Sequence, residues 1–351
     1  MKNQKNYIEE EVTYKNKETG LMLAGTLSLP AERQKSPAVV LIAGMGPNDR
    51  DYVLGEHKFF KVLADYLTKQ GIAVLRFDKR GVGKSEGTFD LTLTSKDLAN
   101  DVLAGVDYLK TRKEVDHKKI GLIGHSEGGL IAPIVAPQTK GVSFLISMAG
   151  VVTTSIKHNV EHVALQLRAD GATEKVIVSD SKLRTKLFEI ITQEPDKNVA
   201  EEELLKITEQ YFSELSEGVK SELEKFVFTI DQKNYKEVIV MLNSPWYRFL
   251  LSYDPAETLK QVKTPVLAIN GDHDFVTSSK ISLPTIEDAL KRAGNKDYKI
   301  IEFPKLNHWF QECETGALVE YGQSEHTIAP VVLQTIVEWV QSVCIKYNLM
   351  H

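Results

Sequence analysis

Cysteine is scarce in this sequence, whose 351 residues include only Cys313 and Cys344. Neither belongs to a C-x-x-C pair or stands near a histidine at the spacing of a zinc site, so we predict no metal centre. The sequence gives no support for a disulfide between the two cysteines. A reducing compartment is therefore the expected environment.

Long apolar runs and a strong excess of one charge are also missing. No window approaches the roughly 18 uninterrupted apolar residues of a membrane span, and the opening MKNQKNYIEEEVTYKN lacks the apolar segment of a signal peptide. The formal net charge is −5, whereas nucleic-acid binding usually needs a concentrated basic face. We expect a cytoplasmic protein without a membrane or nucleic-acid partner, and the sequence makes no prediction of its oligomeric state.

Short apolar runs alternate with helical patterns in both outer parts of the chain. A period-two stretch at 10–30 predicts an antiparallel hairpin with KETG as its turn. The later apolar runs are typical of strands buried on both faces, and this order predicts an α/β fold with a mostly parallel sheet and helices on both faces. The predicted strands are PAVVLIAG (37–44), IAVLRFD (72–78), KKIGLIGHS (118–126), VSFLISMAG (142–150), TPVLAING (264–271) and KDYKIIEF (296–303), of which 37–44, 72–78 and 264–271 are expected to be buried. The predicted helices of these parts span 57–71, 96–112, 286–293 and 328–344, and another is predicted to start in EGGLIAPIVAPQ (127–138).

The alternation stops between residues 151 and 255. Apolar residues there recur at helical spacing, and the stretch is too long for a loop in a compact domain. We interpret 151–255 as a helical lid inserted into a core formed by 1–150 and 256–351. The lid is expected over the carboxyl ends of the strands, where open α/β sheets bind ligands. The apolar positions that predict its helices are Leu183, Leu187, Ile190, Ile191, Leu204, Ile207, Tyr211 and Leu215.

A glycine-flanked serine follows one of the predicted buried strands. GHSEG (124–128) fits the pattern G-x-S-x-G, with a strand before it and a helix after it. This context is typical of a sharp turn that exposes a nucleophilic serine, because small neighbours let the backbone of the turn pass. An ordinary glycine-rich turn is the alternative. We predict Ser126 as the nucleophile.

A serine hydroxyl needs a histidine base and an orienting carboxylate, in this fold in the chain order Ser, Asp or Glu, His. His308 follows the last predicted strand and is the predicted base. Asp274 follows strand 264–271 and is the predicted acid, with Asp272 as the fallback. His125 is expected to point away from the site because the turn is tight. The lid histidines His158 and His162 are expected to be exposed, and His326 comes too late in the chain.

The same chemistry needs two backbone N–H donors for an oxyanion. The N–H of Glu127 stands at the start of a helix, where the helix dipole favours negative charge. The loop after strand 37–44 offers the N–H of Met45 between two glycines, with that of Gly46 as the alternative. In the same region, the carboxylates and arginines of DRD (49–51) and FDKR (77–80) are expected to brace loops through salt bridges.

An aromatic segment, SPWYRFLLSYDP (244–255), precedes the return to the sheet. Trp246, Tyr247 and Phe249 are candidates to line a substrate pocket. The alternative is that they only pack the lid onto the core.

The motifs LIAGMGPNDRD, FDKRGVGKSEG, GHSEGG, SPWYRFLLSYDP and INGDHDFVT together resemble the α/β-hydrolase superfamily over essentially the whole chain. Within it, they are similar to a bacterial esterase group close to the serine aminopeptidase-like hydrolases. The resemblance implies a carboxylesterase for short acyl esters, with Ser126, Asp274 and His308 as a catalytic triad and no cofactor. It also implies that the AGMG loop forms the oxyanion hole. Met45 stands where that loop usually has a small residue, which predicts a narrowed acyl site.

Three other functions fit the same triad positions. An aminopeptidase or amidase needs an acidic anchor for the substrate's ammonium group, and an acyl thioesterase needs basic residues at the mouth of the site. A catalytically inactive hydrolase fold that binds a ligand is the alternative outside the enzymes.

Overall fold

The computed structural model describes residues 7–31, 35–152 and 155–350, and its centre is one eight-stranded sheet. The strand order is β1-β2-β6-β3-β7-β8-β9-β10. β1 and β2 form an antiparallel hairpin, β2 is antiparallel to β6, and every later neighbour pair is parallel. The fold class predicted from the sequence, including the N-terminal hairpin, is confirmed. The strands are β1 (Tyr7–Lys15), β2 (Met22–Pro30), β3 (Ser36–Ile42), β6 (Ala73–Phe77), β7 (Val115–His125), β8 (Phe144–Met148), β9 (Val266–Gly271) and β10 (Tyr298–Phe303); β4 (Val53–Leu54) and β5 (His57–Lys58) form a separate short ribbon.

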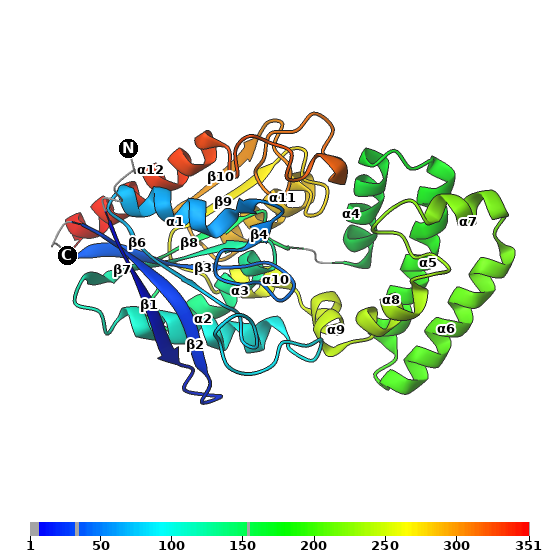
Figure 1. The fold of residues 1–351 in the computed structure, drawn as a ribbon, viewed down its shortest axis with the longest axis horizontal. Helices are drawn as coiled ribbons and strands as arrows, with labels where there is room; N and C mark the ends of the chain where they lie inside the picture. Colours follow the sequence, from blue (N-terminus) through cyan, green and yellow to red (C-terminus); the bar gives the residue numbers. More distant parts are fainter. Residues whose placement is uncertain (1–6, 32–34, 153–154, 351) are drawn as a thin grey trace.

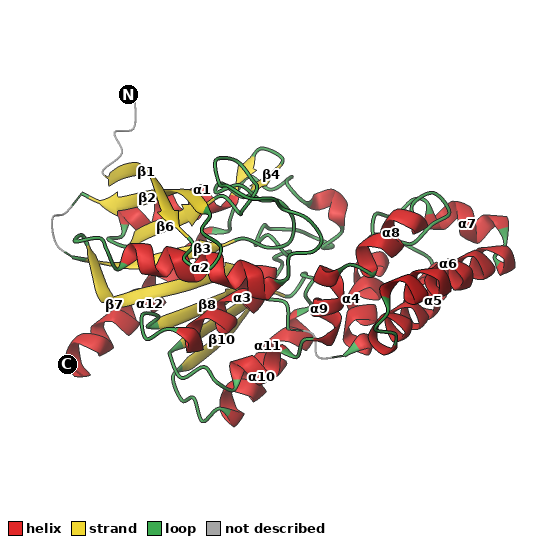
Figure 2. Ribbon diagram, turned by 90° about the horizontal axis from the view of Figure 1, so that it is seen from below, coloured by secondary structure: helices red, strands yellow, loops and turns green. Residues whose placement is uncertain are grey.

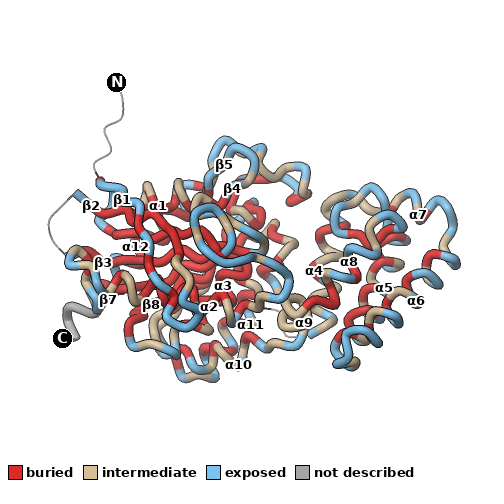
Figure 3. The backbone as a smooth tube through the Cα atoms, turned by 60° about the horizontal axis from the view of Figure 1, so that its bottom comes forward, coloured by how far each residue is buried: buried red, intermediate tan, exposed pale blue. Residues whose placement is uncertain are grey.

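Helices cover both faces of this sheet, as predicted (Figure 1). The central strands β6 and β8 are buried at every position, which explains their unbroken apolar runs. One apolar cluster packs the sheet against α2, α3 and α11, and a second packs it against α1 and α12. Figure 3 colours the backbone by burial: the strands of the sheet are mostly buried, and exposed residues lie on the outer sides of the helices. These helices are α1 (Phe59–Lys69), α2 (Ser95–Leu109), α3 (Glu127–Val135), α11 (Ser279–Arg292) and α12 (Pro330–Met350).

Three loops at the carboxyl edge of the parallel strands carry the predicted triad. β7 ends at His125 and α3 begins at Glu127, so Ser126 is the only residue between them. Asp274 follows the end of β9, and His308 follows the end of β10. Because β7, β8, β9 and β10 run parallel in successive pairs, their carboxyl ends lie at one edge of the sheet.

The segment between β8 and β9 is helical and has its own apolar cluster, to one side of the sheet (Figure 2). Its longest helix, α5, buries Leu183, Leu187 and Ile191, as the helical spacing predicts. In α6 the buried stripe includes Leu204 and Phe212, whereas the predicted Ile207 is only partly buried. The interpretation of 151–255 as a lid stays a prediction, and α10 spans its predicted boundary. The helices are α4 (Ile156–Ala169), α5 (Glu174–Gln193), α6 (Lys197–Glu214), α7 (Glu217–Leu223), α8 (Tyr235–Leu242), α9 (Pro245–Ser252) and α10 (Pro255–Leu259), and two 3₁₀ helices of the chain are η1 (Ala136–Gln138) and η2 (Leu318–Glu320).

Cys313 and Cys344 are both free thiols and both buried. Burial raises the pKa of each thiol to about 11, so both are neutral at physiological pH. Among the described helices, none is long and apolar enough to cross a membrane.

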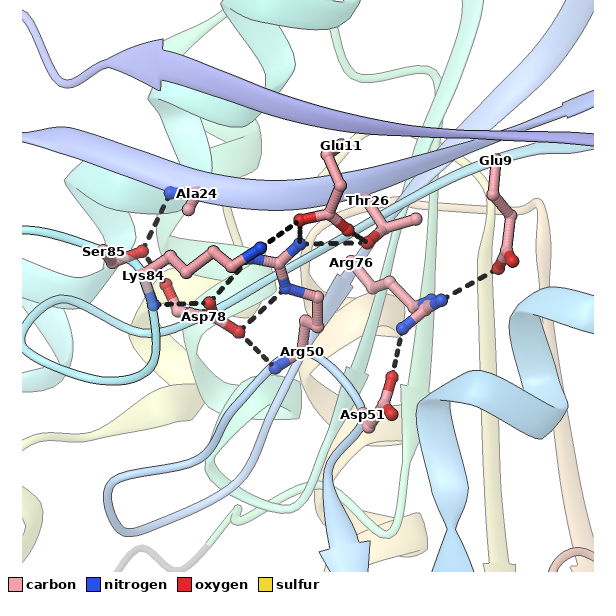
Figure 4. Close-up of polar contacts among 10 residues, drawn as sticks. All are labelled: Glu9, Glu11, Ala24, Thr26, Arg50, Asp51, Arg76, Asp78, Lys84 and Ser85. Atoms are coloured by element: carbon pink, nitrogen blue, oxygen red, sulfur yellow. Dashed lines mark hydrogen bonds and ion pairs between the residues drawn. The ribbon is translucent and has the colours of Figure 1, made fainter.

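A network of charged side chains ties the N-terminal hairpin to the loop after β3 (Figure 4). The Arg50 guanidinium donates to both carboxylate oxygens of Asp78, from Nε at 3.0 Å and from Nη2 at 2.7 Å. Arg76 bonds Glu9 of β1 at 2.9 Å and also pairs with Asp51. The expectation that DRD (49–51) braces this loop through salt bridges is confirmed.

Replacing Arg50 by methionine is expected to lower the free energy of unfolding by about 2 kcal/mol at pH 7. Burial alone would raise the pKa of Asp78, but hydrogen bonds from Arg50 and the Lys84 backbone outweigh burial and lower it. A depressed folded-state pKa stabilises the fold above the unfolded value of about 3.9, and this stabilisation is lost as the pH falls through the folded pKa. Urea unfolding of both proteins should therefore show a gap that is widest near neutral pH and narrows below pH 4. A gap that widens on acidification would contradict this assignment.

Candidate active site

Ser126 occupies a strained turn between β7 and α3. Its φ of 56° and ψ of −121° lie in a region that residues other than glycine rarely adopt. A Cβ atom on Gly124 would overlap the carbonyl oxygen of Gly128, and one on Gly128 would overlap that of Ile42. Both glycines are therefore required by close backbone contacts, which is the geometry expected of a nucleophile elbow.

His308 and Asp274 form a buried pair across the loops after β10 and β9. His308 Nδ1 lies 2.8 Å from Asp274 Oδ2, and the side chains are 8% and 0% exposed. Because a carboxylate accepts, Nδ1 carries the proton, and Nε2 is left as the base nitrogen of neutral His308. Thr277 holds the carboxylate from behind, with its N–H 2.9 Å from Oδ1 and its hydroxyl 2.8 Å from Oδ2 of Asp274. Sequence reasoning missed Thr277, although its position three residues after an aspartate is a usual one for such a turn.

The fallback acid, Asp272, lies elsewhere in the same loop. Its Oδ1 accepts hydrogen bonds from the Lys305 N–H and from the ring of His273, both at 2.6 Å. Its side chain is partly exposed, and it is the neighbouring Asp274 that faces His308.

The contact between Ser126 and His308 is less direct. Among the hydrogen bonds of the described residues, none joins Ser126 Oγ to the His308 ring. The loop of His308 is nevertheless fixed at the elbow, because His125 Nε2 lies 2.7 Å from the His308 carbonyl oxygen and the two rings are 4.8 Å apart. Catalytic hydrogen bonds are often long without substrate and tighten in its presence.

Both ring nitrogens of His125 are occupied away from the candidate acyl site. Nε2 donates to the His308 carbonyl, so Nδ1 accepts from the Tyr52 hydroxyl at 3.0 Å. Burial and the nearby His308 hold the pKa of His125 well below its usual value. His125 is therefore a neutral imidazole that connects the loop of Tyr52 to the loop of His308. Tyr52 was missed from the sequence.

The loop after β3 passes directly beside the elbow. A Cβ atom on Gly44 would lie 2.9 Å from Ser126 Cβ and would overlap the Tyr52 hydroxyl, so this position also requires glycine. Within the described part of the chain, the N–H groups of Met45 and Glu127 donate to no acceptor. Two free donors beside one serine are what an oxyanion hole requires.

The side chain of Glu127 is buried under the elbow. Its carboxylate accepts from Ser95 Oγ at 2.8 Å and from the Trp246 indole at 3.0 Å, and Lys79 Nζ lies 3.8 Å away. The sequence analysis gave no role to Ser95 or to Lys79, although Lys79 lies in FDKR (77–80), because the partners of both side chains lie in distant segments.

The three aromatic residues proposed for the pocket diverge. Trp246 of α9 reaches Glu127, as described above. Tyr247 packs inside the helical segment with its ring 5.8 Å from Phe188, and burial raises its pKa. Phe249 stacks on Tyr253 at 4.8 Å between ring centroids. Of the three, only Trp246 contacts a residue of the elbow.

His162 of α4 lies close to the acid and base. The expectation that it is exposed is wrong: the residue is 6% exposed, because α4 packs this side toward the core. Burial, partly offset by the charge of Asp274, lowers the pKa of His162 to about 4. Its Nε2 has no hydrogen-bond partner among the described residues. A neutral imidazole from the helical segment therefore borders the His308–Asp274 pair.

The chain is similar in sequence to known enzymes. The family described as serine aminopeptidase, S33, matches residues 53–205. Esterase EstD of Thermotoga maritima is 27% identical over 340 residues, which are 95% of this chain and 69% of that protein.

Two solved structures share the fold at low sequence identity. An esterase of Pyrococcus furiosus has a TM-score of 0.55 at 15% identity, over 96% of this chain and 91% of that one. The α/β hydrolase GrgF of a Penicillium species has a TM-score of 0.56 at 16% identity, over 95% and 98%. The fold can now be assigned from three observations: the eight-stranded sheet, the strand–serine–helix turn at its carboxyl edge and these structural similarities. The chain has the α/β-hydrolase fold.

Proposed function

We propose that this protein is a serine carboxylesterase that hydrolyses short-chain acyl esters. The observation that carries the proposal is the buried His308–Asp274 pair, held against the strained turn of Ser126. The 27% identity to a protein named as an esterase, over 95% of this chain, supports it further.

In the proposed acylation step, Ser126 Oγ attacks the acyl carbon and His308 Nε2 takes the hydroxyl proton. Asp274 stabilises the imidazolium that forms. The N–H groups of Met45 and Glu127 bind the negative oxygen of the tetrahedral intermediate. His308 then gives its proton to the leaving alcohol, and the acyl group stays on Ser126 as an ester.

Deacylation repeats these steps with water as the nucleophile. His308 takes a proton from water, and the hydroxide oxygen attacks the acyl carbon. His308 then returns the proton to Ser126 Oγ as the carboxylic acid leaves. Every proton moves between substrate, water, Ser126 and His308, so the proposed reaction requires no metal or organic cofactor.

The environment of the elbow favours an ester over an aminopeptidase substrate. An aminopeptidase needs a carboxylate for the ammonium group of its substrate. The Glu127 carboxylate, which is next to the nucleophile in sequence, is buried and already bonded to Ser95 and Trp246. We also propose that the helices of 151–255 act as the lid of the site, since His162 of α4 and Trp246 of α9 both reach its surroundings.

The proposal is tested first by covalent labelling. A fluorophosphonate probe should label the folded protein at one site, and peptide mapping should locate the adduct on Ser126. The heat-denatured protein and the Ser126→Ala variant should not react. An unlabelled native protein, or an S126A variant labelled to the same extent, would overturn the proposal and favour a ligand-binding protein without activity.

The substrate class is tested by comparing an ester, an aminoacyl anilide and a thioester that all carry small acyl groups. We expect kcat/KM for p-nitrophenyl acetate to exceed kcat/KM for alanine p-nitroanilide and for acetyl-CoA. A preference for the anilide would instead favour the aminopeptidase function named by the matching family, and a preference for acetyl-CoA would favour a thioesterase.

A further inference from the structure

We infer that Lys79 is a positioning residue for the oxyanion hole: it holds the peptide between Gly44 and Met45 so that the Met45 N–H faces Ser126. The inference rests on the proposed function, because it concerns the reaction at the same serine. Lys79 itself would touch neither the substrate nor the reacting atoms.

The argument begins with the geometry of one peptide group. Lys79 Nζ donates a hydrogen bond to the Gly44 carbonyl oxygen, and Asn48 Nδ2 donates to the same oxygen at 3.0 Å. In a trans peptide, the carbonyl of one residue and the N–H of the next point in opposite directions. The described residues contain no cis peptide bond. Fixing the Gly44 carbonyl on one side therefore fixes the Met45 N–H on the other.

Gly44, the first residue of this peptide, lies beside the candidate nucleophile. A Cβ atom on Gly44 would lie 2.9 Å from Ser126 Cβ and 3.3 Å from Ser126 Oγ, so the backbone of Gly44 passes close to the serine. The Met45 N–H has no acceptor of its own among the described residues. It is therefore available for a substrate oxygen.

The positive charge of Lys79 is paired with the carboxylate of Glu127, the residue whose N–H is the second proposed oxyanion donor. Its ammonium group is 5% exposed and lies 3.8 Å from the Glu127 carboxylate, which is 1% exposed. Glu127 is also the residue whose own N–H is the other oxyanion donor. One buried ion pair thus connects both donor peptides, and Trp246 links this pair to α9. A buried charge needs such partners to be tolerated, and these partners also restrict where the ammonium group can lie.

The hydrogen bond from Lys79 has a consequence for catalysis. An ammonium group on the carbonyl oxygen polarises the peptide, so the Met45 N–H becomes a stronger donor. A stronger donor matters most when full negative charge develops on the substrate oxygen, which happens in the transition state. Loss of Lys79 should therefore lower kcat and leave KM nearly unchanged.

The test replaces Lys79 by methionine, which keeps the length and removes the donor. We expect kcat for p-nitrophenyl acetate to fall about 10- to 100-fold, less than the loss of an oxyanion donor itself, with KM within about threefold. Affinity for a trifluoromethyl ketone, which forms an oxyanion adduct with serine, should fall in parallel. The control is Lys84→Met, which removes an exposed lysine of the same segment that pairs with Glu11.

Rates are expressed per active site, titrated to completion with the fluorophosphonate probe. A merely structural role would reduce the number of titrated sites and leave kcat per site unchanged, which would overturn the inference. If Lys79→Met does not fold, Asn48→Ala removes the other donor to Gly44 without stripping a buried charge, and about a threefold to tenfold loss of kcat is expected. An unchanged kcat per site in the N48A variant would then be the overturning result. Because titration of the wild type reports whether Ser126 is activated in the folded protein, failure of the proposed function is seen separately.

Discussion

Replacing Asp274 by asparagine is expected to lower kcat for ester hydrolysis about 10⁴-fold, with little change in fold. The carboxylate accepts a hydrogen bond from His308 Nδ1 at 2.8 Å and stabilises the imidazolium during the reaction. An amide at this place turns an NH₂ group toward Nδ1 and favours the ring tautomer that carries its proton on Nε2. His308 then cannot take the proton of Ser126. Steady-state kinetics with p-nitrophenyl acetate, together with a circular dichroism spectrum, measures the effect.

Asp272 supplies a matched control two residues away. Its carboxylate bonds the Lys305 N–H and the ring of His273, so Asp272→Asn alters the same loop without touching the base. We expect kcat of this variant to stay within about threefold of the wild type. A deep loss in D272N with near-normal activity in D274N would instead make Asp272 the acid.

The parts of the fold that the sequence predicts are those with a local physical signal. A strand buried on both faces must be apolar at every position, so β8 is readable from VSFLISMAG alone. The elbow is readable because Gly124 and Gly128 are required by contacts within a few residues and with one neighbouring strand. For α11 the prediction begins seven residues late, at Ile286 instead of Ser279, because the helix contains Pro284 in its first turns, where the sequence favours an interruption.

The missed residues of the candidate site depend on contacts between distant segments. Tyr52 meets His125 across 73 residues, and Ser95 meets Glu127 across 32. No spacing within either segment indicates that its hydroxyl is needed by the other. The burial of His162 is of the same kind, because it depends on where α4 packs. In α6, the apolar residues are numerous enough to fit two neighbouring stripes, and only the packing partner decides between them.

Replacing Arg80 by methionine is expected to lower the free energy of unfolding by about 3–5 kcal/mol. Arg80 donates to both carboxylate oxygens of Asp101, at 2.7 and 2.8 Å, and also to the Asp97 carbonyl at 2.8 Å. The two side chains are 7% and 2% exposed. The variant leaves Asp101 as a buried negative charge, and among the described residues Asn16 is its one remaining hydrogen-bond donor, at 2.7 Å. Urea unfolding of the two proteins at pH 7 measures the loss.

Two further variants separate the buried charge from the lost packing. Asp107 lies on α2, the helix of Asp101, and Lys17→Met removes a salt-bridge partner of Asp107. Because Lys17 is 79% exposed, its loss is expected to change stability by about 1 kcal/mol or less. In the double variant R80M/D101N the buried carboxylate becomes a neutral amide whose oxygen still accepts from Asn16. Its stability should therefore exceed that of Arg80→Met alone. If the double variant is no more stable than Arg80→Met alone, the cost of Arg80→Met comes from lost contacts and not from an unpaired charge.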